Sequence, residues 1–172
     1  MFIRLLIILA LMAPVCLAQD LTVQDIRQKM DAGWYEEANA LLTPLARVPD
    51  ADPIILYLKA KSLLYMGNFQ EAERWAEKSV KAAPDSASFW TMLGTTKAFQ
   101  VRNSPLKGIT KCRSCKKNIE KGAQLDPANI ESVRAWLTFN LYAPGIVGGN
   151  KDKARQLAED LYAVDPVQGH LA

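Results

Sequence analysis

The chain has 172 residues, of which 49% are apolar and 23% are charged. This composition is typical of a globular protein and excludes a disordered chain. Three cysteines are too few for a disulfide-dense mini-protein, and a single histidine excludes most zinc sites and hydrolytic triads. The net charge of +3 is small, but it averages over regions of opposite sign.

Residues 1–18 have the pattern of a cleavable signal peptide. One basic residue, Arg4, precedes an apolar run from Leu5 to Ala18, which is too short to span a membrane as a helix. Small residues stand before Gln19, where a signal peptidase would cut. We therefore expect an exported protein, periplasmic or secreted, whose mature chain begins at Gln19.

A period of 34 residues organises the rest of the chain. The segment from Gly33 to Ala38 (GWYEEA) recurs 34 residues later, from Gly67 to Ala72 (GNFQEA). Each glycine allows a tight turn after one helix, the aromatic residue packs beneath it, and the alanine lets a second helix approach closely. A period of this length is typical of stacked helical arrays.

The recurring residues resemble the tetratricopeptide repeat (TPR) family. In that family, each unit of two antiparallel helices carries a Trp or Leu, then Leu-Gly, an Ala and a closing Pro. The residues that fill these positions here are Trp90, Leu93, Gly94, Gly67, Ala72 and Pro84. The resemblance covers residues 20–166. It implies an all-α fold, a right-handed superhelical array of antiparallel helix pairs (a TPR-like α-solenoid).

The resemblance divides the chain after the signal peptide into four units. They are repeat 1 (19–52, divergent), repeat 2 (53–86), repeat 3 (87–129, with an insertion near 100–110) and repeat 4 (130–166, with a Gly-rich loop at 143–150). Residues 167–172 read as the truncated start of a further helix. We expect the insertions to form loops and the last helix pair, with Leu157, Leu161 and Tyr162, to be partly uncovered. A second copy or a partner would then cap this C-terminal end.

Positive charge is concentrated in the third unit. Residues 97–121 contain eight basic residues and one acidic residue, whereas the rest of the chain after residue 18 contains 12 basic and 17 acidic residues. This patch indicates a solvated loop and helix face, and binding to an acidic protein segment or an anionic envelope surface is the alternative. Nucleic acid is not expected, because the insertion lacks aromatic residues for base stacking. The patch residues are Lys107, Lys111, Arg113, Lys116, Lys117 and Lys121.

Cys112 and Cys115 form a Cys-x-x-Cys motif, and the basic residues around it are expected to lower the thiol pKa. A thioredoxin-like site is disfavoured because no strand pattern surrounds the motif, and a zinc site lacks further ligands. Haem attachment would need a histidine where Lys116 stands. We expect a structural pair, with Cys115 in the Ala position of the repeat and a small disulfide to Cys112. Thiol redox or metal handling is the alternative.

The segment from Ala143 to Lys151 contains three glycines that could cradle an anion. It does not fit a phosphate loop of the Walker kind, because Asn150 separates the last glycine from the lysine and a helix precedes the segment. It resembles a stretch that precedes a Lys-Ala helix in some exported bacterial TPR proteins. We expect a rigid turn between two helices.

These observations predict an adaptor that catalyses no reaction, needs no cofactor and binds a protein or peptide segment. The family resemblance implies that the segment lies in a concave groove formed by the first helix of each unit. Lys61 and Arg134 would hold a carboxylate of the ligand. The predicted groove residues are Tyr57, Lys61, Tyr65, Thr91, Thr95, Phe99, Arg134 and Thr138.

Overall fold

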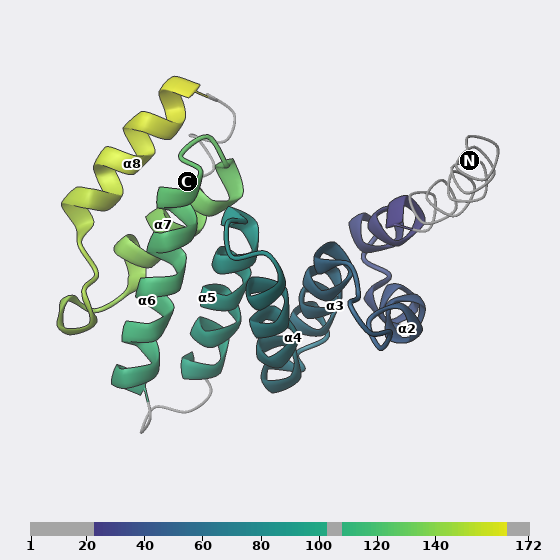
Figure 1. Ribbon diagram of the computed structural model, residues 1–172. Helices are drawn as coiled ribbons and strands as arrows, with labels where there is room; N and C mark the ends of the chain where they lie inside the picture. Colours follow the sequence, from purple (N-terminus) through teal and green to yellow (C-terminus); the bar gives the residue numbers. More distant parts are fainter. Residues whose placement is uncertain (1–22, 103–107, 165–172) are drawn as a thin grey trace, which may run out of the picture.

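The computed structural model describes residues 23–102 and 108–164, and within these ranges it contains helices and no strand. The helices follow one another across the molecule in chain order (Figure 1). They form pairs: a helix over residues 23–31 with α2 (Tyr35–Leu45), α3 (Pro53–Tyr65) with α4 (Phe69–Ala82), α5 (Ala87–Arg102) with α6 (Gly108–Leu125), and α7 (Ile130–Tyr142) with α8 (Lys151–Val164). The prediction of an all-α array of helix pairs is confirmed.

The turns inside the first two pairs depend on glycine. Gly33 and Gly67 have φ angles of 81° and 79°, a left-handed conformation that glycine adopts without a steric cost. The alanines five positions later, Ala38 and Ala72, are fully buried. Both roles predicted from the 34-residue period are therefore confirmed.

The apolar side chains gather in two cores of unequal size. The larger core runs through the first two pairs and ends on α5 at Phe89, Met92 and Leu93. The smaller core contains Cys115, Ile119, Trp136 and Phe139, on α6 and α7. Among the described residues, the larger of the two clusters therefore lies in the N-terminal half.

The insertion in the third unit lengthens the helices. We expected a loop near 100–110, but α5 continues to Arg102 and α6 begins at Gly108. α5 has 16 residues where α3 has 13, and α6 has 18 where α4 has 14. Most of the extra residues are thus helical, because they extend a packed interface between α5 and α6, and Gly108 starts a helix.

The last helix is partly uncovered, as we expected. Leu161 on α8 is buried, with 4% of its surface exposed, and Leu157 is half-buried against the smaller core. Tyr162 has 48% of its surface exposed. The predicted start of a further helix at 167–172 lies outside the described residues. Within those residues, none of the helices combines the length and the apolar character needed to cross a membrane.

Candidate functional site

The first helices of successive pairs form one face of the molecule, which we call the inner face. Along it α3 contacts α5, and α5 contacts α7. Two pockets lie on this face. One, the charged pocket, is shared by the helix over residues 23–31, α3, the start of α5 and the start of α7. The other, the apolar pocket, lies between α5 and α7, with α6 beneath it.

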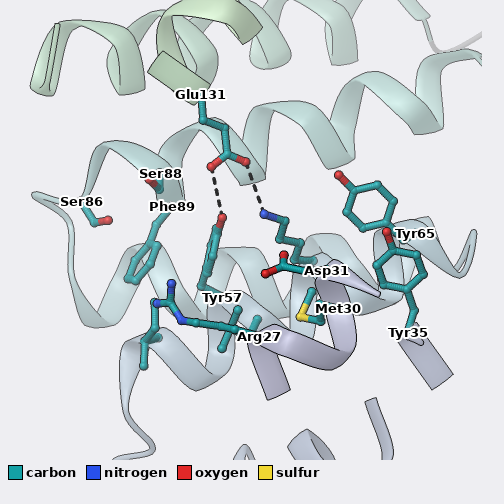
Figure 2. A pocket seen from close by; sticks show the side chains of 13 residues that line it. Arg27, Met30, Asp31, Tyr35, Tyr57, Tyr65, Ser86, Ser88, Phe89 and Glu131 are labelled. Carbon is teal, nitrogen blue, oxygen red and sulfur yellow. Dashed lines mark hydrogen bonds and ion pairs between the residues drawn. The ribbon is translucent and has the colours of Figure 1, made fainter. Parts of the chain in front are cut away.

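The charged pocket has a volume of about 590 Å³ and combines four charged side chains with stacked aromatic rings. Tyr57 stacks on Phe89 with ring centroids 5.1 Å apart, and Tyr35 stacks on Tyr65 at 4.6 Å. Figure 2 shows the two tyrosine rings of the second stack at one side of the pocket, with Tyr57 and Phe89 at the other. The charged residues are Arg27, Asp31, Lys61 and Glu131.

Glu131 reaches into the charged pocket from the first turn of α7. The Tyr57 hydroxyl donates to Glu131 Oε2 at 3.5 Å, and Lys61 Nζ lies 3.8 Å from Glu131 Oε1 (Figure 2). Burial raises the pKa of the Tyr57 hydroxyl, and the negative charge of Glu131 adds to this rise. One carboxylate therefore joins two helices whose contacting residues, Tyr57 and Glu131, are 74 positions apart.

The apolar pocket has a volume of about 440 Å³ and is lined mainly by apolar and small side chains. Phe99, 41% exposed, stacks on Phe69 at 5.6 Å and forms one wall. Tyr142, 78% exposed, lies at the end of α7 and lines the pocket with Phe139. Side chains of this type exposed in a concave site are typical of ligand-binding surfaces.

The two pockets follow one another along the same helices. On α5, Phe89 lines the charged pocket and Phe99 lines the apolar pocket. Ten helical residues separate them, which corresponds to about 15 Å along the axis. On α7 the order is the same, with Glu131 in the first pocket and Thr138 in the second. A ligand that lies along the inner face would therefore meet both.

The predicted groove residues divide between the pockets. Tyr57, Lys61 and Tyr65 line the charged pocket, and Thr95, Phe99 and Thr138 line the apolar pocket. Whether these residues bind a ligand stays a prediction.

The other two predicted groove residues line neither pocket. Thr91 is 3% exposed, and its hydroxyl donates to Ser132 Oγ at 2.8 Å. It is therefore buried in the contact between α5 and α7 and does not face the groove. Arg134 is half-buried on α7 and lines neither of the two pockets, and its pairing with Lys61 around a carboxylate of the ligand stays a prediction.

The sequence reasoning missed Arg27, Asp31 and Glu131 in the charged pocket and Cys112 and Tyr142 in the apolar pocket. The register of the repeat marks positions along each first helix, but it does not predict a contact between α3 and α7. For Tyr142 a signal was present, since it is an aromatic residue at the end of a first helix, in the position that Tyr65 has on α3.

The two cysteines are free thiols, so the predicted disulfide is not formed in the structure. Both lie on α6, where residues three apart keep their Cβ atoms about 5–6 Å apart, which is longer than a disulfide allows. The expected fall in thiol pKa is also wrong. Burial raises the pKa of Cys115 to about 12 and raises that of Cys112, and Lys97 and Lys111 offset only part of the effect at Cys115. Thiolate chemistry is therefore disfavoured at neutral pH.

The described residues also bear on the expected packing role of Cys115 and on the metal-handling alternative. Cys115 is fully buried, as expected for the Ala position of the repeat, and its thiol donates to the Lys111 carbonyl oxygen at 3.0 Å. Among the residues that the structure describes, no group of three or more His, Cys, Asp or Glu side chains is arranged to hold a metal ion.

Part of the predicted basic patch is neutralised inside the fold. Lys111 Nζ lies 3.0 Å from Glu73 Oε2 on α4, and the Lys121 ammonium lies 3.9 Å from the centre of the Trp90 ring. Lys116 is half-buried beside Gly148. Arg113 and Lys117 are exposed on α6, and Lys107 lies outside the described residues. Binding of an anionic partner through this patch stays a prediction.

The Gly-rich segment forms a closed turn that includes the short 3₁₀ helix η2 (Gly145–Val147). Several of its amide groups are used in backbone hydrogen bonds: Gly148 N donates to Gly145 O and Gly149 N to Pro144 O within the turn, and Asn150 N donates to Asn140 O on α7. A cradle for an anion needs amide groups that point to the ligand. The geometry is that of the rigid turn that we expected.

Comparisons with known proteins support the fold. No protein-family model matches the sequence, and no curated protein matches it. Among solved structures, the chain is similar to TTC0263, a thermophilic TPR protein in Thermus thermophilus, with a TM-score of 0.73 and 16% identity over 86% of this chain and 74% of that chain. It is also similar to the HusA haemophore from Porphyromonas gingivalis, with a TM-score of 0.68 and 20% identity over 88% of this chain and 84% of that chain. The chain therefore has the helical-array fold of tetratricopeptide repeat proteins.

Proposed function

We propose that the protein is a non-catalytic scaffold that binds a segment of a partner protein along its inner face. The observation that carries this proposal is the succession of the charged pocket and the apolar pocket along α5 and α7. A buried apolar or aromatic anchor supplies most of the affinity in such interfaces, and charged groups at its side select the partner. Phe99 and Tyr142 offer the apolar contact, and Lys61 and Arg27 offer the charged one.

The proposal is tested by selecting ligands from a random peptide library displayed on phage and measuring their affinity for two variants. Thr138→Arg introduces a long charged side chain at an exposed position of the apolar pocket. Ala40→Arg adds the same charge on the exposed side of α2 and serves as the control. We expect selected peptides to carry an apolar residue, to lose at least tenfold in affinity for Thr138→Arg and to bind Ala40→Arg normally. Equal binding to both variants would remove the apolar pocket from the proposal.

A second candidate ligand for the apolar pocket is a flat apolar ring such as haem. The structural neighbour HusA is a haemophore. The observation that favours the candidate here is the placement of Phe99, Phe139 and Tyr142 around one apolar pocket of about 440 Å³. Titration with haemin would give a saturable shift of its absorbance band at one equivalent, and Thr138→Arg would abolish the shift. An unchanged haemin spectrum at excess protein would exclude this ligand.

We also propose that the protein acts outside the cytoplasm, after removal of residues 1–18. The support is the sequence pattern alone, a basic residue followed by an apolar run and small residues before Gln19. Expression of the full chain in a Gram-negative host, followed by N-terminal sequencing of the periplasmic fraction, is expected to give a chain that starts at Gln19. A cytoplasmic protein that retains Met1 would contradict the proposal.

A further inference from the structure

The contact between Glu131 and α3 is loose on both sides. The distances of 3.8 Å to Lys61 Nζ and 3.5 Å to the Tyr57 hydroxyl exceed those of well-formed charge-assisted hydrogen bonds, which lie near 2.7–2.9 Å. The Glu131 side chain is 52% exposed and that of Lys61 is 29% exposed. Such an exposed ion pair stabilises a fold only weakly, because water screens the two charges. The contact contributes little to folding, yet it places a carboxylate beside an ammonium group inside a pocket.

We propose, on the basis of the proposed peptide-binding function, that Glu131 is an internal competitor that occupies the position where a Glu or Asp side chain of the partner binds. The partner's carboxylate accepts hydrogen bonds from Lys61 and from the Tyr57 hydroxyl, and Glu131 turns outward to solvent. The site therefore selects a segment with an acidic residue. Glu131 sets the affinity by occupying that position when the partner is absent.

The hydrogen-bonding needs of the pocket support this assignment. Tyr57 is 6% exposed, and its hydroxyl reaches the Glu131 carboxylate. When Glu131 is released, the Tyr57 hydroxyl needs another acceptor, either water in the pocket or a group of the ligand. A carboxylate from the partner meets this requirement and also restores the partner of Lys61. Arg27 and Asp31 line the same pocket, so with Glu131 turned outward two positive charges face one negative charge and the balance favours an anion.

The spacing of the pockets places a limit on the ligand. Along α7, Glu131 and Thr138 are separated by seven helical residues, or about 10 Å, and along α5 the corresponding separation is about 15 Å. An extended chain advances about 3.3 Å per residue. The acidic residue of the partner should therefore lie about three to five residues from the apolar residue that fills the apolar pocket.

The competition is tested with N-acetyl-L-glutamic acid α-amide, which carries a single side-chain carboxylate, and with the uncharged N-acetyl-L-glutamine amide. NMR shifts of Lys61 and Tyr57 are followed during titration of the wild type, Glu131→Gln and Glu131→Ala. Glu159→Gln, an exposed position on α8, changes the net charge equally and is the control. We expect both Glu131 variants to bind the glutamate probe at least threefold more tightly than the wild type and the control do. The glutamine probe should bind all four proteins equally weakly.

Two outcomes would overturn the proposal. One is a glutamate affinity that is equal in the wild type and in both Glu131 variants. The other is a shift pattern centred on the exposed Arg113 and Lys117 of α6, without change at Lys61. Neither outcome depends on the apolar pocket. If the glutamate probe binds as expected while selected peptides ignore Thr138→Arg, the carboxylate position stands and the extended peptide site fails. The reverse result leaves the peptide site and removes the competitor.

Discussion

The helix pairs α3–α4 and α5–α6 have the same topology, but different contacts hold them together. In the first pair, the small residues Ala60, Ala72 and Ala76 are fully buried within the larger core. In the second pair, glycine replaces alanine on the first helix and larger residues replace alanine on the second. Gly94 stands 34 residues after Ala60, while Cys115 and Ile119 stand 43 residues after Ala72 and Ala76. In the α5–α6 pair, the missing side chain of the glycine on the first helix therefore leaves room for the larger side chains on the second helix.

The difference has consequences for the inner face. Most apolar side chains of α3 and α4 fill a core, although Tyr65 is exposed and lines the charged pocket. On α5, Phe99 is exposed and lines the apolar pocket together with Tyr142 of the next helix pair. The α5–α6 pair is held by the close approach of the backbones of α5 and α6 at Gly94 and by ion pairs from Lys97 and Lys111 to Glu73 on α4. It also carries a buried amide nitrogen, Asn118 Nδ2, that has no hydrogen-bond partner among the described residues. The pair that lines the apolar pocket thus also holds an unpaired buried amide nitrogen.

The largest expected effect breaks the close approach of α5 and α6. A Cβ atom on Gly94 would lie 2.9 Å from Ile119 N and 3.0 Å from Cys115 O, which are backbone atoms that cannot move independently. We expect Gly94→Ala to lower the free energy of unfolding by about 1–3 kcal/mol, despite the better helix propensity of alanine. Urea denaturation measures the change.

Gly108→Ala in the same helix pair is the control. Among the residues that the structure describes, its added Cβ would meet Val101 Cγ1 alone, at an ordinary 3.5 Å. We expect its free energy of unfolding to stay within about 0.5 kcal/mol of the wild type. If Gly94→Ala were as stable as this control, the contrast with Ala60 in the first pair would have no energetic meaning.

These packing rules also explain how far the sequence predicts the structure. The glycine turns and the buried alanines follow from local chemistry and recur with the 34-residue period, so the helix pairs were predictable. The insertion was not, because Gly108 disfavours a helix locally while the extended α5–α6 interface favours one. The contact of Glu131 with Lys61 could not be predicted from the sequence either, because it depends on how α7 is placed relative to α3 in three dimensions. At Cys115, burial raises the thiol pKa by more than the neighbouring lysines lower it, and the sequence shows the lysines but not the burial.

The second effect concerns the charges that connect α4 to the second pair. Glu73 lies 3.7 Å from Lys97 Nζ and 3.0 Å from Lys111 Nζ, and its side chain is 18% exposed. Glu73→Gln removes the negative charge shared by two partly buried lysines, and we expect a loss of about 1–2 kcal/mol in the free energy of unfolding. Glu71→Gln, an exposed position on the same helix, is expected to change it by about 0.5 kcal/mol or less. Equal losses would show that the Glu73 network contributes no more than surface charge.

The third effect uses pH to probe the buried thiol of the second pair. The pKa of Cys115 is raised from 9.0 to about 12 in the folded protein, so the folded state keeps its proton after the unfolded state has lost it. The stabilisation is complete below pH 9 and is lost as pH rises from 9 toward 12, by about 1.4 kcal/mol per pH unit. Thermal unfolding between pH 8 and pH 10.5 should therefore show a shallower decline for Cys115→Ala than for the wild type. Parallel declines would mean that the thiol is not the group responsible.

The smallest expected effect concerns the α3–α4 pair, in which α3 carries a buried lysine, Lys59. Lys59 is 4% exposed and donates to Asn39 O at 3.3 Å and to Thr43 Oγ1, which are both uncharged acceptors on α2. Burial lowers the pKa of Lys59, so the protonated side chain makes folding less favourable at neutral pH. This penalty disappears as pH approaches 10.5, where the unfolded lysine also loses its proton.

Lys59→Met should therefore leave the free energy of unfolding at pH 7 unchanged or raise it by about 1 kcal/mol. The Thr43 hydroxyl keeps its hydrogen bond to Asn39 O, at 2.7 Å, when the lysine is absent. Urea denaturation at pH 7 and pH 10 measures this, with the exposed Lys81→Met as control, and the advantage of Lys59→Met should shrink at the higher pH. A loss above about 1 kcal/mol would mean that the hydrogen bonds of Lys59 outweigh its desolvation. The stability of α3 against α2 would then depend on the hydrogen bonds of Lys59, just as the stability of α5 and α6 against α4 depends on the ion pairs of Glu73.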